Sequence, residues 1–193
     1  ACIVRVRVRV SRAGAVLVFS AAGSLVYVRA PAGSAANGVV RVNRAGAITV
    51  VDTAWYGAFN SFALSPDGRR LAVGVGTGAG LNVWTKQMDR GPFTRLTFGN
   101  QDRRPVWSTD GRSVAFIRDS ASTSAVYARP VDGSGPDKFM ARLDRQVQEV
   151  SWTSDGKWLL MRTDNGAVGA GDLIAVRTSG DTTPVPLLTS NFS

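Results

Sequence analysis

Four times along the chain, an apolar stretch ends in Ser or Thr, a tight turn containing glycine follows, and a second apolar stretch begins. The four copies are FSAAGSLVYV (residues 19–28), LSPDGRRLAV (residues 64–73), WSTDGRSVAF (residues 107–116) and WTSDGKWLLM (residues 152–161). The turn glycines Gly23, Gly68, Gly111 and Gly156 are separated by 45, 43 and 45 residues. A fixed period of this size is typical of a repeat architecture.

The second copy shows what one repeat builds. A short strand is predicted over residues 61–65, and Pro66-Asp67-Gly68 then forms a tight turn. Proline suits the first corner because its φ is fixed, aspartate bonds the backbone two residues on, and glycine takes a positive φ. Three more strands follow over residues 70–75, 81–85 and 93–98. Four short strands joined by tight turns predict one antiparallel up-and-down sheet.

The other copies repeat this order of strands. In the first copy the strands are expected over residues 16–20, 24–28, 39–43 and 47–52. In the third they are expected over residues 106–108, 113–118, 125–128 and 138–143, and in the fourth over residues 148–153, 158–162, 173–177 and 184–189. The chain holds one Glu and three Lys, so common surface helix formers are scarce and helical repeats are disfavoured.

A four-stranded unit of roughly 40 to 50 residues is a propeller blade. The sequence therefore predicts an all-β fold, a β-propeller or partial propeller of about four four-stranded antiparallel blades. The expected single domain, residues 1–193, comprises an N-terminal edge strand in residues 1–14 and blades over about 15–53, 54–99, 100–145 and 146–193.

The turn phrases also carry a family resemblance. LSPDGRRLAV and RPVWSTDGRSVAFIRD, followed by VYARPVDGSG, resemble the blades of TolB-like propellers, whose hallmark is an SPDG-type turn between the two inner strands. The order LVYV, VRVNRAGAI, LSPDGRRLAV, NVW and LTFGNQDRRPVWSTDG is most similar to propellers fused behind bacterial Ser/Thr kinases. The resemblance covers residues 15–193 and implies a fold that many unrelated proteins use. It also implies a bacterial periplasmic or extracellular location.

Two features depart from that family. The first turn reads AAG in place of PDG, and the family usually closes a ring of six blades, whereas four copies are visible here. Because propellers protect their strand edges by closing into a ring, four blades predict either a genuine four-blade closure or self-association of two chains across the open faces. The strand expected over residues 3–10 could complete a blade that lacks its outer strand.

The net charge of +9 is concentrated at the start of the chain, where residues 1–50 hold seven arginines and no acid. Strict alternation over residues 3–10 would place Arg5, Arg7 and Arg9 on one face of a strand. Such a basic strand can attract nucleic acid or an acidic protein, or it can simply be solvated or paired with another blade. No base-stacking aromatics are interleaved with these arginines, so nucleic-acid binding is not favoured. No apolar run is long enough to span a membrane as a helix.

The residue types limit the chemistry. The chain contains no histidine, which excludes Ser-His-Asp and Cys-His hydrolase sites and the commonest zinc ligand sets. The glycine tract of residues 74–80 has Ala79 where a dinucleotide fingerprint needs glycine, and no calcium-loop spacing is present. We therefore expect no catalytic residue, metal or cofactor. The alternative is a hydrolase with a Ser-Lys or Asp-based site, or the regulatory propeller of one, since peptidases of the prolyl-oligopeptidase kind carry similar blades.

The remaining candidates for function are loops. In a propeller, the loop entering each blade and the loop between its second and third strands lie on one face, opposite the repeated turns. These segments are expected over residues 30–38, 53–60, 74–80, 99–104, 119–124, 144–148 and 163–171. The entry loops carry Trp55, Tyr56, Asn100, Asp102, Arg103, Arg104, Arg145 and Gln146.

Aromatic and arginine side chains on rigidly supported loops suit recognition of a protein or peptide partner. The alternative is that these side chains pair with one another, for instance Asp102 with an arginine of an adjacent blade. The sequence leaves both interpretations open.

Overall fold

The computed structural model describes residues 17–19, 25–29, 37–52, 56–89, 91–163 and 171–189. These residues contain sixteen β-strands and no helix, so no described helix could span a membrane. The predicted edge strand of residues 1–14, with Arg5, Arg7 and Arg9, lies outside the described residues, as does Trp55.

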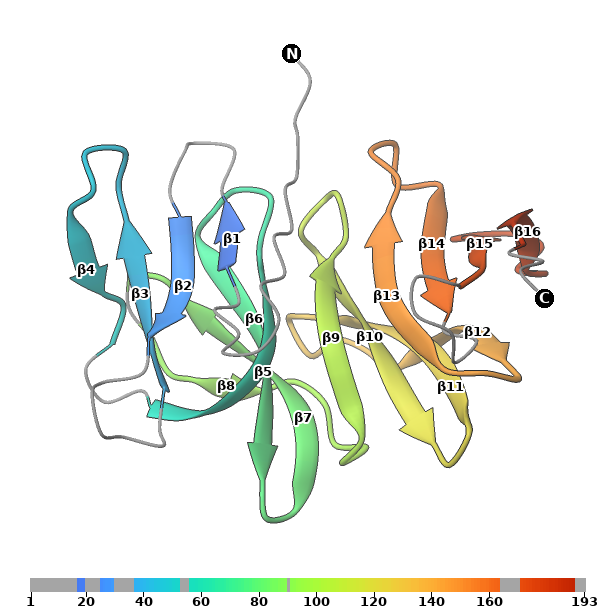
Figure 1. The fold of residues 1–193 in the computed structure, drawn as a ribbon, viewed down its shortest axis with the longest axis horizontal. Helices are drawn as coiled ribbons and strands as arrows, with labels where there is room; N and C mark the ends of the chain where they lie inside the picture. Colours follow the sequence, from blue (N-terminus) through green and yellow to red (C-terminus); the bar gives the residue numbers. More distant parts are fainter. Residues whose placement is uncertain are drawn as a thin grey trace.

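The strands form four antiparallel groups of four, which we call blades 1 to 4 (Figure 1). Blade 1 holds β1 (Leu17–Phe19), β2 (Leu25–Arg29), β3 (Asn37–Val42) and β4 (Ile48–Val50), and blade 2 holds β5 (Tyr56–Leu64), β6 (Arg70–Thr77), β7 (Gly80–Gln87) and β8 (Thr94–Arg95). Blade 3 holds β9 (Asp102–Trp107), β10 (Ser113–Ser120), β11 (Thr123–Pro130) and β12 (Lys138–Leu143), and blade 4 holds β13 (Val147–Trp152), β14 (Trp158–Thr163), β15 (Leu173–Arg177) and β16 (Val185–Leu188). A short ladder between β3 and β5 also joins blades 1 and 2. The predicted all-β propeller class is confirmed.

The inner strands of blades 2 and 3 differ from the prediction. Strand β5 begins at Tyr56 and β9 at Asp102, each at least four residues earlier than expected. In both strands the pairing register with the next strand shifts near the middle, as in a β-bulge. A bulge inserts an extra residue and interrupts the alternation of apolar and polar positions, which hid the first half of each strand in the sequence.

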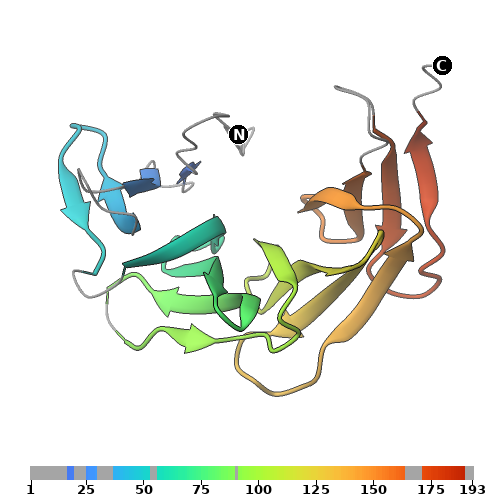
Figure 2. The same ribbon diagram turned by 60° about the horizontal axis from the view of Figure 1, so that its bottom comes forward.

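The blades follow an arc (Figure 2). Strands β5, β9 and β13 are the first strands of blades 2, 3 and 4, and each packs beside the next along the concave side of the arc. Blades 1 and 4 lie at the two ends of the arc, and their described strands share no sheet. The described part of the chain therefore does not form a ring closed by four blades.

A hydrophobic core fills each junction between neighbouring blades. Strand β10 shows how one strand serves two cores: Val114 and Phe116 pack against blade 2, whereas Ala115 and Ile117 pack against blade 4. Successive side chains of a strand point to opposite faces, so a strand between two blades must be apolar at every position. This burial on both faces explains the continuous apolar runs after the repeated turns of blades 2 and 3.

The repeated turn is held by its own side chains. In blade 2, Ser65 Oγ donates a hydrogen bond to Asp67 Oδ1 at 2.5 Å and accepts one from the Arg70 amide at 2.8 Å. Gly68 has φ of 72°, in the left-handed region that glycine favours. Blades 3 and 4 repeat the hydroxyl–aspartate bond, at 2.6 Å in each. The phrase is therefore a structural corner, as predicted.

Candidate functional site

The end of the propeller opposite the repeated turns, which we call the loop end, carries a pocket of about 260 Å³ beside blade 3. It is lined by Gly99, Arg118, Asp119, Ser120, Thr123, Ala125, Tyr127 and Arg142. Two of the predicted loop segments contribute to this lining, residues 99–104 before β9 and residues 119–124 at the β10–β11 hairpin. The hairpin lies in the lower part of Figure 1. We take this pocket and its supporting residues as the candidate site.

Asp102 is the buried anchor of the site, with no solvent-exposed surface. It occupies the position on β9 that pairs with Arg118 on β10. Arg118 donates from Nε to Asp102 Oδ1 at 2.6 Å and from Nη2 to Oδ2 at 3.1 Å, and the Gly99 amide also donates to Oδ2 at 3.0 Å. Asp102 therefore pairs with an arginine of its own blade and holds the entry segment against β10.

Arg118 is held from several sides. Besides Asp102, its Nη2 donates to Asp137 Oδ2 at 2.9 Å, and its guanidinium lies 4.6 Å from the ring centroid of Tyr127. The hydrogen bonds to these two carboxylates, above all to Asp102, raise the pKa of Arg118 above its usual value. Arg118 is consequently a fixed, fully charged wall of the pocket.

Arg103 links blade 3 to blade 4. Its guanidinium binds both carboxylate oxygens of Asp119, with Nη2 donating to Oδ1 at 3.0 Å, and Nη2 also donates to the carbonyl oxygen of Val147 at 2.7 Å. Ser124 Oγ donates to the same carboxylate at 2.8 Å and accepts from the Val147 amide at 3.1 Å. The β10–β11 hairpin is thereby fixed to the first strand of blade 4.

Arg104 contacts the blades on both sides. Its amide donates to Ser61 Oγ of blade 2 at 3.1 Å, and its Nη1 lies 2.9 Å from Glu149 Oε1 of blade 4. The residue has φ of 55°, in a left-handed region that non-glycine residues seldom enter. This conformation coincides with the bulge of β9, and the neighbouring inner strands hold it in place.

Asn100 fixes the segment between blades 2 and 3. Its amide donates to Asn82 Oδ1 at 3.1 Å, and its Oδ1 accepts from Asn82 Nδ2 at 3.2 Å and from Arg95 Nη2 at 3.0 Å. Asn100 also has a positive φ, 62°, which asparagine tolerates better than most residues. The entry segment is therefore fixed to blade 2 by a polar side chain.

The entry segment of blade 4 is held in the same manner. Arg145 Nη1 lies 2.7 Å from Asp172 Oδ2, and Gln146 Nε2 donates to the carbonyl oxygen of Ala121 at 3.2 Å. Arg145 keeps 42% of its side chain exposed and so also faces solvent.

Six of the eight predicted loop residues thus meet at the loop end, and all six are paired within the chain. Tyr56 begins β5, but its side chain is outside the described part. Sequence reasoning missed Tyr127 and the exposed Arg142, because both lie inside predicted strands and only the packing of blade 3 against the Gly99 segment brings them to a pocket. Among the described residues, no three His, Cys, Asp or Glu side chains are grouped as a metal site.

The fold can be compared with those of known proteins. No protein-family model and no curated protein matches the sequence. Among solved structures, a putative TolB from Agrobacterium tumefaciens is similar with a TM-score of 0.73 and 19% identity over 89% of this chain and 60% of its own. TolB from Acinetobacter baumannii is similar with a TM-score of 0.67 and 20% identity over 86% of this chain and 43% of its own. The chain thus shares the propeller fold of TolB-like proteins and spans less than two thirds of their length.

Enzymes are among the similar structures as well. An oligogalacturonate lyase from Vibrio parahaemolyticus has a TM-score of 0.63 and 13% identity over 88% of this chain and 52% of its own. At this level of identity the likeness extends to the fold alone.

Proposed function

We propose that this chain is a non-catalytic recognition module that binds a protein or peptide at the loop end of blades 3 and 4. The observation that supports it most is the rigidity of the site: Asp102, Arg103 and Arg104 tie the entry segment to three blades at once. Side chains that are already fixed lose little conformational entropy when a partner binds, which favours recognition.

The pocket also indicates which chemical group the partner presents. Arg118 and Asp119 are each neutralised by a partner within the chain, whereas Arg142 is exposed at the rim. Tyr127 adds an aromatic surface and Ser120 and Thr123 add hydroxyls. An acidic side chain on a peptide fits this combination, because arginine binds a carboxylate through two parallel hydrogen bonds.

Peptides selected from a random display library on the wild-type chain test this proposal. We expect Arg142→Glu to lower the affinity for the selected peptides by about tenfold or more. Charge reversal at an interface arginine removes a favourable charge pair and adds a repulsive one. The affinity is measured by fluorescence anisotropy. Arg69→Glu is the matched control, because Arg69 is also exposed but lies on a repeated turn at the opposite end. Equal loss in both variants, or no loss at Arg142, would count against a loop-end site.

Two resemblances support a binding module. TolB structures and a chain of a nidogen–laminin complex share the fold. The sequence phrases that resemble propellers behind bacterial Ser/Thr kinases support a module that recognises a ligand on behalf of another domain. The hydrolase alternative stays a prediction, which a broad ester and peptide substrate screen on the purified chain would test.

We also propose that two chains associate through the ends of the arc. Blade 1 exposes Ile48 and Val50 on β4, and blade 4 exposes Leu187 and Leu188 on β16. Ring closure is how propellers usually protect such edges, so association is the expected alternative. Light scattering coupled to size exclusion should show the mass rising from 20.4 kDa towards a dimer as concentration increases. A mass that stays monomeric at every concentration would refute it.

A further inference from the structure

Arg70 occupies a defined position between blades 2 and 3, at the end that carries the repeated turns. Its guanidinium lies 4.7 Å from the ring centroid of Trp107, and its Nη2 donates to the carbonyl oxygen of Gly111 at 2.5 Å. Trp107 in turn donates from Nε1 to the carbonyl oxygen of Ala63 at 2.9 Å and is 1% exposed. An arginine of one blade thus covers the tryptophan that ends the inner strand of the next.

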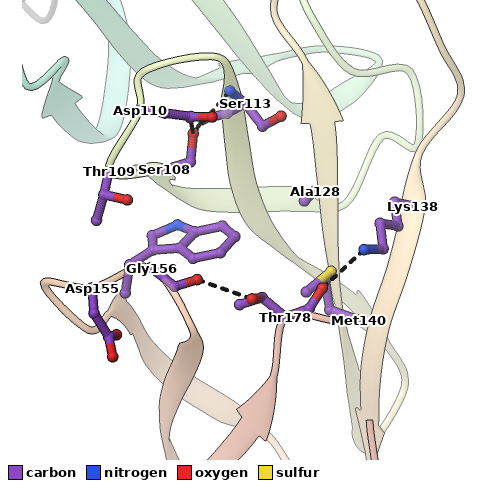
Figure 3. Close-up of a pocket in the computed structure, with 11 residues that line it drawn as sticks. Ser108, Thr109, Asp110, Ser113, Ala128, Lys138, Met140, Asp155, Gly156 and Thr178 are labelled. Carbon is purple, nitrogen blue, oxygen red and sulfur yellow. Dashed lines mark hydrogen bonds between the residues drawn. The ribbon is translucent and has the colours of Figure 1, made fainter. Parts of the chain in front are cut away.

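The same positions one repeat later are filled differently. Ser113 follows its turn glycine by two residues, as Arg70 does, but it is too short to reach blade 4. A pocket of about 290 Å³ lies at this junction instead (Figure 3). It is lined by Ser108, Thr109, Asp110, Ser113, Ala128, Lys138, Met140, Trp152, Asp155, Gly156 and Thr178.

Trp152 at this junction differs from its counterpart Trp107. Its side chain is only partly buried, and its buried Nε1 has no hydrogen-bond partner among the described residues. The exposed part of the indole lines the pocket, whereas Nε1 has no surface that a ligand in the pocket could reach.

The charges around the pocket favour a cation. Asp110 and Asp155 belong to the turns of blades 3 and 4, and Figure 3 shows them away from Lys138, which lies on the other side of the pocket. Hydrogen bonds from Ser108 and Thr153 lower the pKa of these two carboxyls, so both are ionised at neutral pH. Lys138 Nζ already donates to the carbonyl oxygen of Thr178 at 2.9 Å.

We propose that this pocket binds an arginine side chain of a partner polypeptide. The bound guanidinium takes the place over Trp152 that Arg70 takes over Trp107, on the side of the pocket that carries Asp110 and Asp155. A planar guanidinium stacks on an indole and pairs with carboxylates in a way that the compact ammonium of lysine does not. The site lies at the end opposite Arg142 and is independent of the proposed loop-end function.

The test uses a short fluorescein-labelled peptide with one arginine between glycine and serine residues, and matched peptides with lysine or citrulline. Citrulline keeps the shape of arginine but has no charge. We expect the arginine peptide to bind at least about tenfold more tightly than the citrulline peptide, with the lysine peptide between them. Anisotropy gives the affinities. Equal binding of the arginine and citrulline peptides would overturn the proposal.

Ser113→Arg is the decisive variant, because it fills the pocket from within as Arg70 does in the preceding blade. We expect it to reduce binding of the arginine peptide by about tenfold or more and to raise the midpoint of thermal unfolding. A raised midpoint, measured on the same variant, would show that the loss of binding does not come from unfolding. Unchanged binding by Ser113→Arg would refute the site.

Two further measurements distinguish this site from others. Lys138→Gln should raise the affinity for the arginine peptide a few-fold, because it removes a like charge. Arg142→Glu at the loop end should leave the affinity for the arginine peptide unchanged.

Discussion

Replacing Asp102 by alanine is expected to lower the free energy of unfolding by about 3–5 kcal/mol, the usual cost of breaking a buried ion pair by removing one partner. The carboxylate is fully buried and accepts three hydrogen bonds, two from Arg118 and one from the Gly99 amide. Its loss leaves Arg118 Nε and the Gly99 amide without their acceptor, although Arg118 Nη2 keeps its bond to Asp137, and it detaches the entry segment from β10. Urea unfolding followed by tryptophan fluorescence measures the change.

Asp144→Ala is the matched control, since Asp144 forms an ion pair with Arg145 but has 84% of its side chain exposed. Exposed pairs contribute about 0–1 kcal/mol, so this variant should unfold almost as the wild type does. Asp102→Asn should fall between the two, because it keeps an acceptor oxygen and loses the charge. If Asp102→Ala lowered the free energy of unfolding no more than Asp144→Ala does, the buried hydrogen bonds of Asp102 would not be what stabilises the loop end.

The sequence was sufficient to predict the blades because their determinants are local. The hydroxyl, aspartate and glycine of each turn contact one another within a few residues, and strand β12 matches the predicted residues 138–143. The strands before the turns were predicted too short, since the bulge at Arg104 breaks the two-residue periodicity on which strand prediction depends.

The candidate site could be predicted only in part, because its contacts cross blades. Six of the entry-loop residues lie at one end of the described structure, but whether such residues face a partner or pair within the chain depends on residues far away in sequence. Arg103 reaches Val147 and Arg104 reaches Glu149, each about one repeat ahead. Internal pairing was one of two open interpretations, with an arginine of an adjacent blade as the example for Asp102, yet its arginine, Arg118, lies on the next strand of the same blade. No local pattern distinguishes these outcomes.

The two tryptophans before the turns show the same limit. Both stand just before a repeated turn, and Trp107 is almost fully buried. Trp152 packs against the core between blades 3 and 4, but part of its side chain lines a pocket. The difference arises in the preceding blade, where Arg70 covers one indole and Ser113 leaves the other uncovered. Repeat position therefore predicts where a side chain lies, whereas the residue one repeat earlier decides what covers it.

This difference predicts unequal effects of truncating the two tryptophans. Trp107→Ala should lower the free energy of unfolding by about 3–5 kcal/mol, the usual cost of removing a large buried aromatic side chain. It removes the indole from the core between blades 2 and 3, together with its hydrogen bond to Ala63 and its contact with Arg70. Trp107→Phe should lower the free energy of unfolding by about 1–3 kcal/mol, because an aromatic ring stays in the core but the buried carbonyl of Ala63 loses its donor.

Trp152→Ala should lower the free energy of unfolding by less than Trp107→Ala does. Trp152 is partly exposed, and its Nε1 has no acceptor to lose among the described residues. Urea unfolding followed by far-ultraviolet circular dichroism compares the three variants without depending on tryptophan emission. Equal costs for Trp107→Ala and Trp152→Ala would mean that the two junctions are packed alike, and the contrast between Arg70 and Ser113 would then have no energetic consequence. Unequal costs in the expected order would show that the junction between blades 2 and 3 is packed more tightly around its tryptophan than the junction between blades 3 and 4.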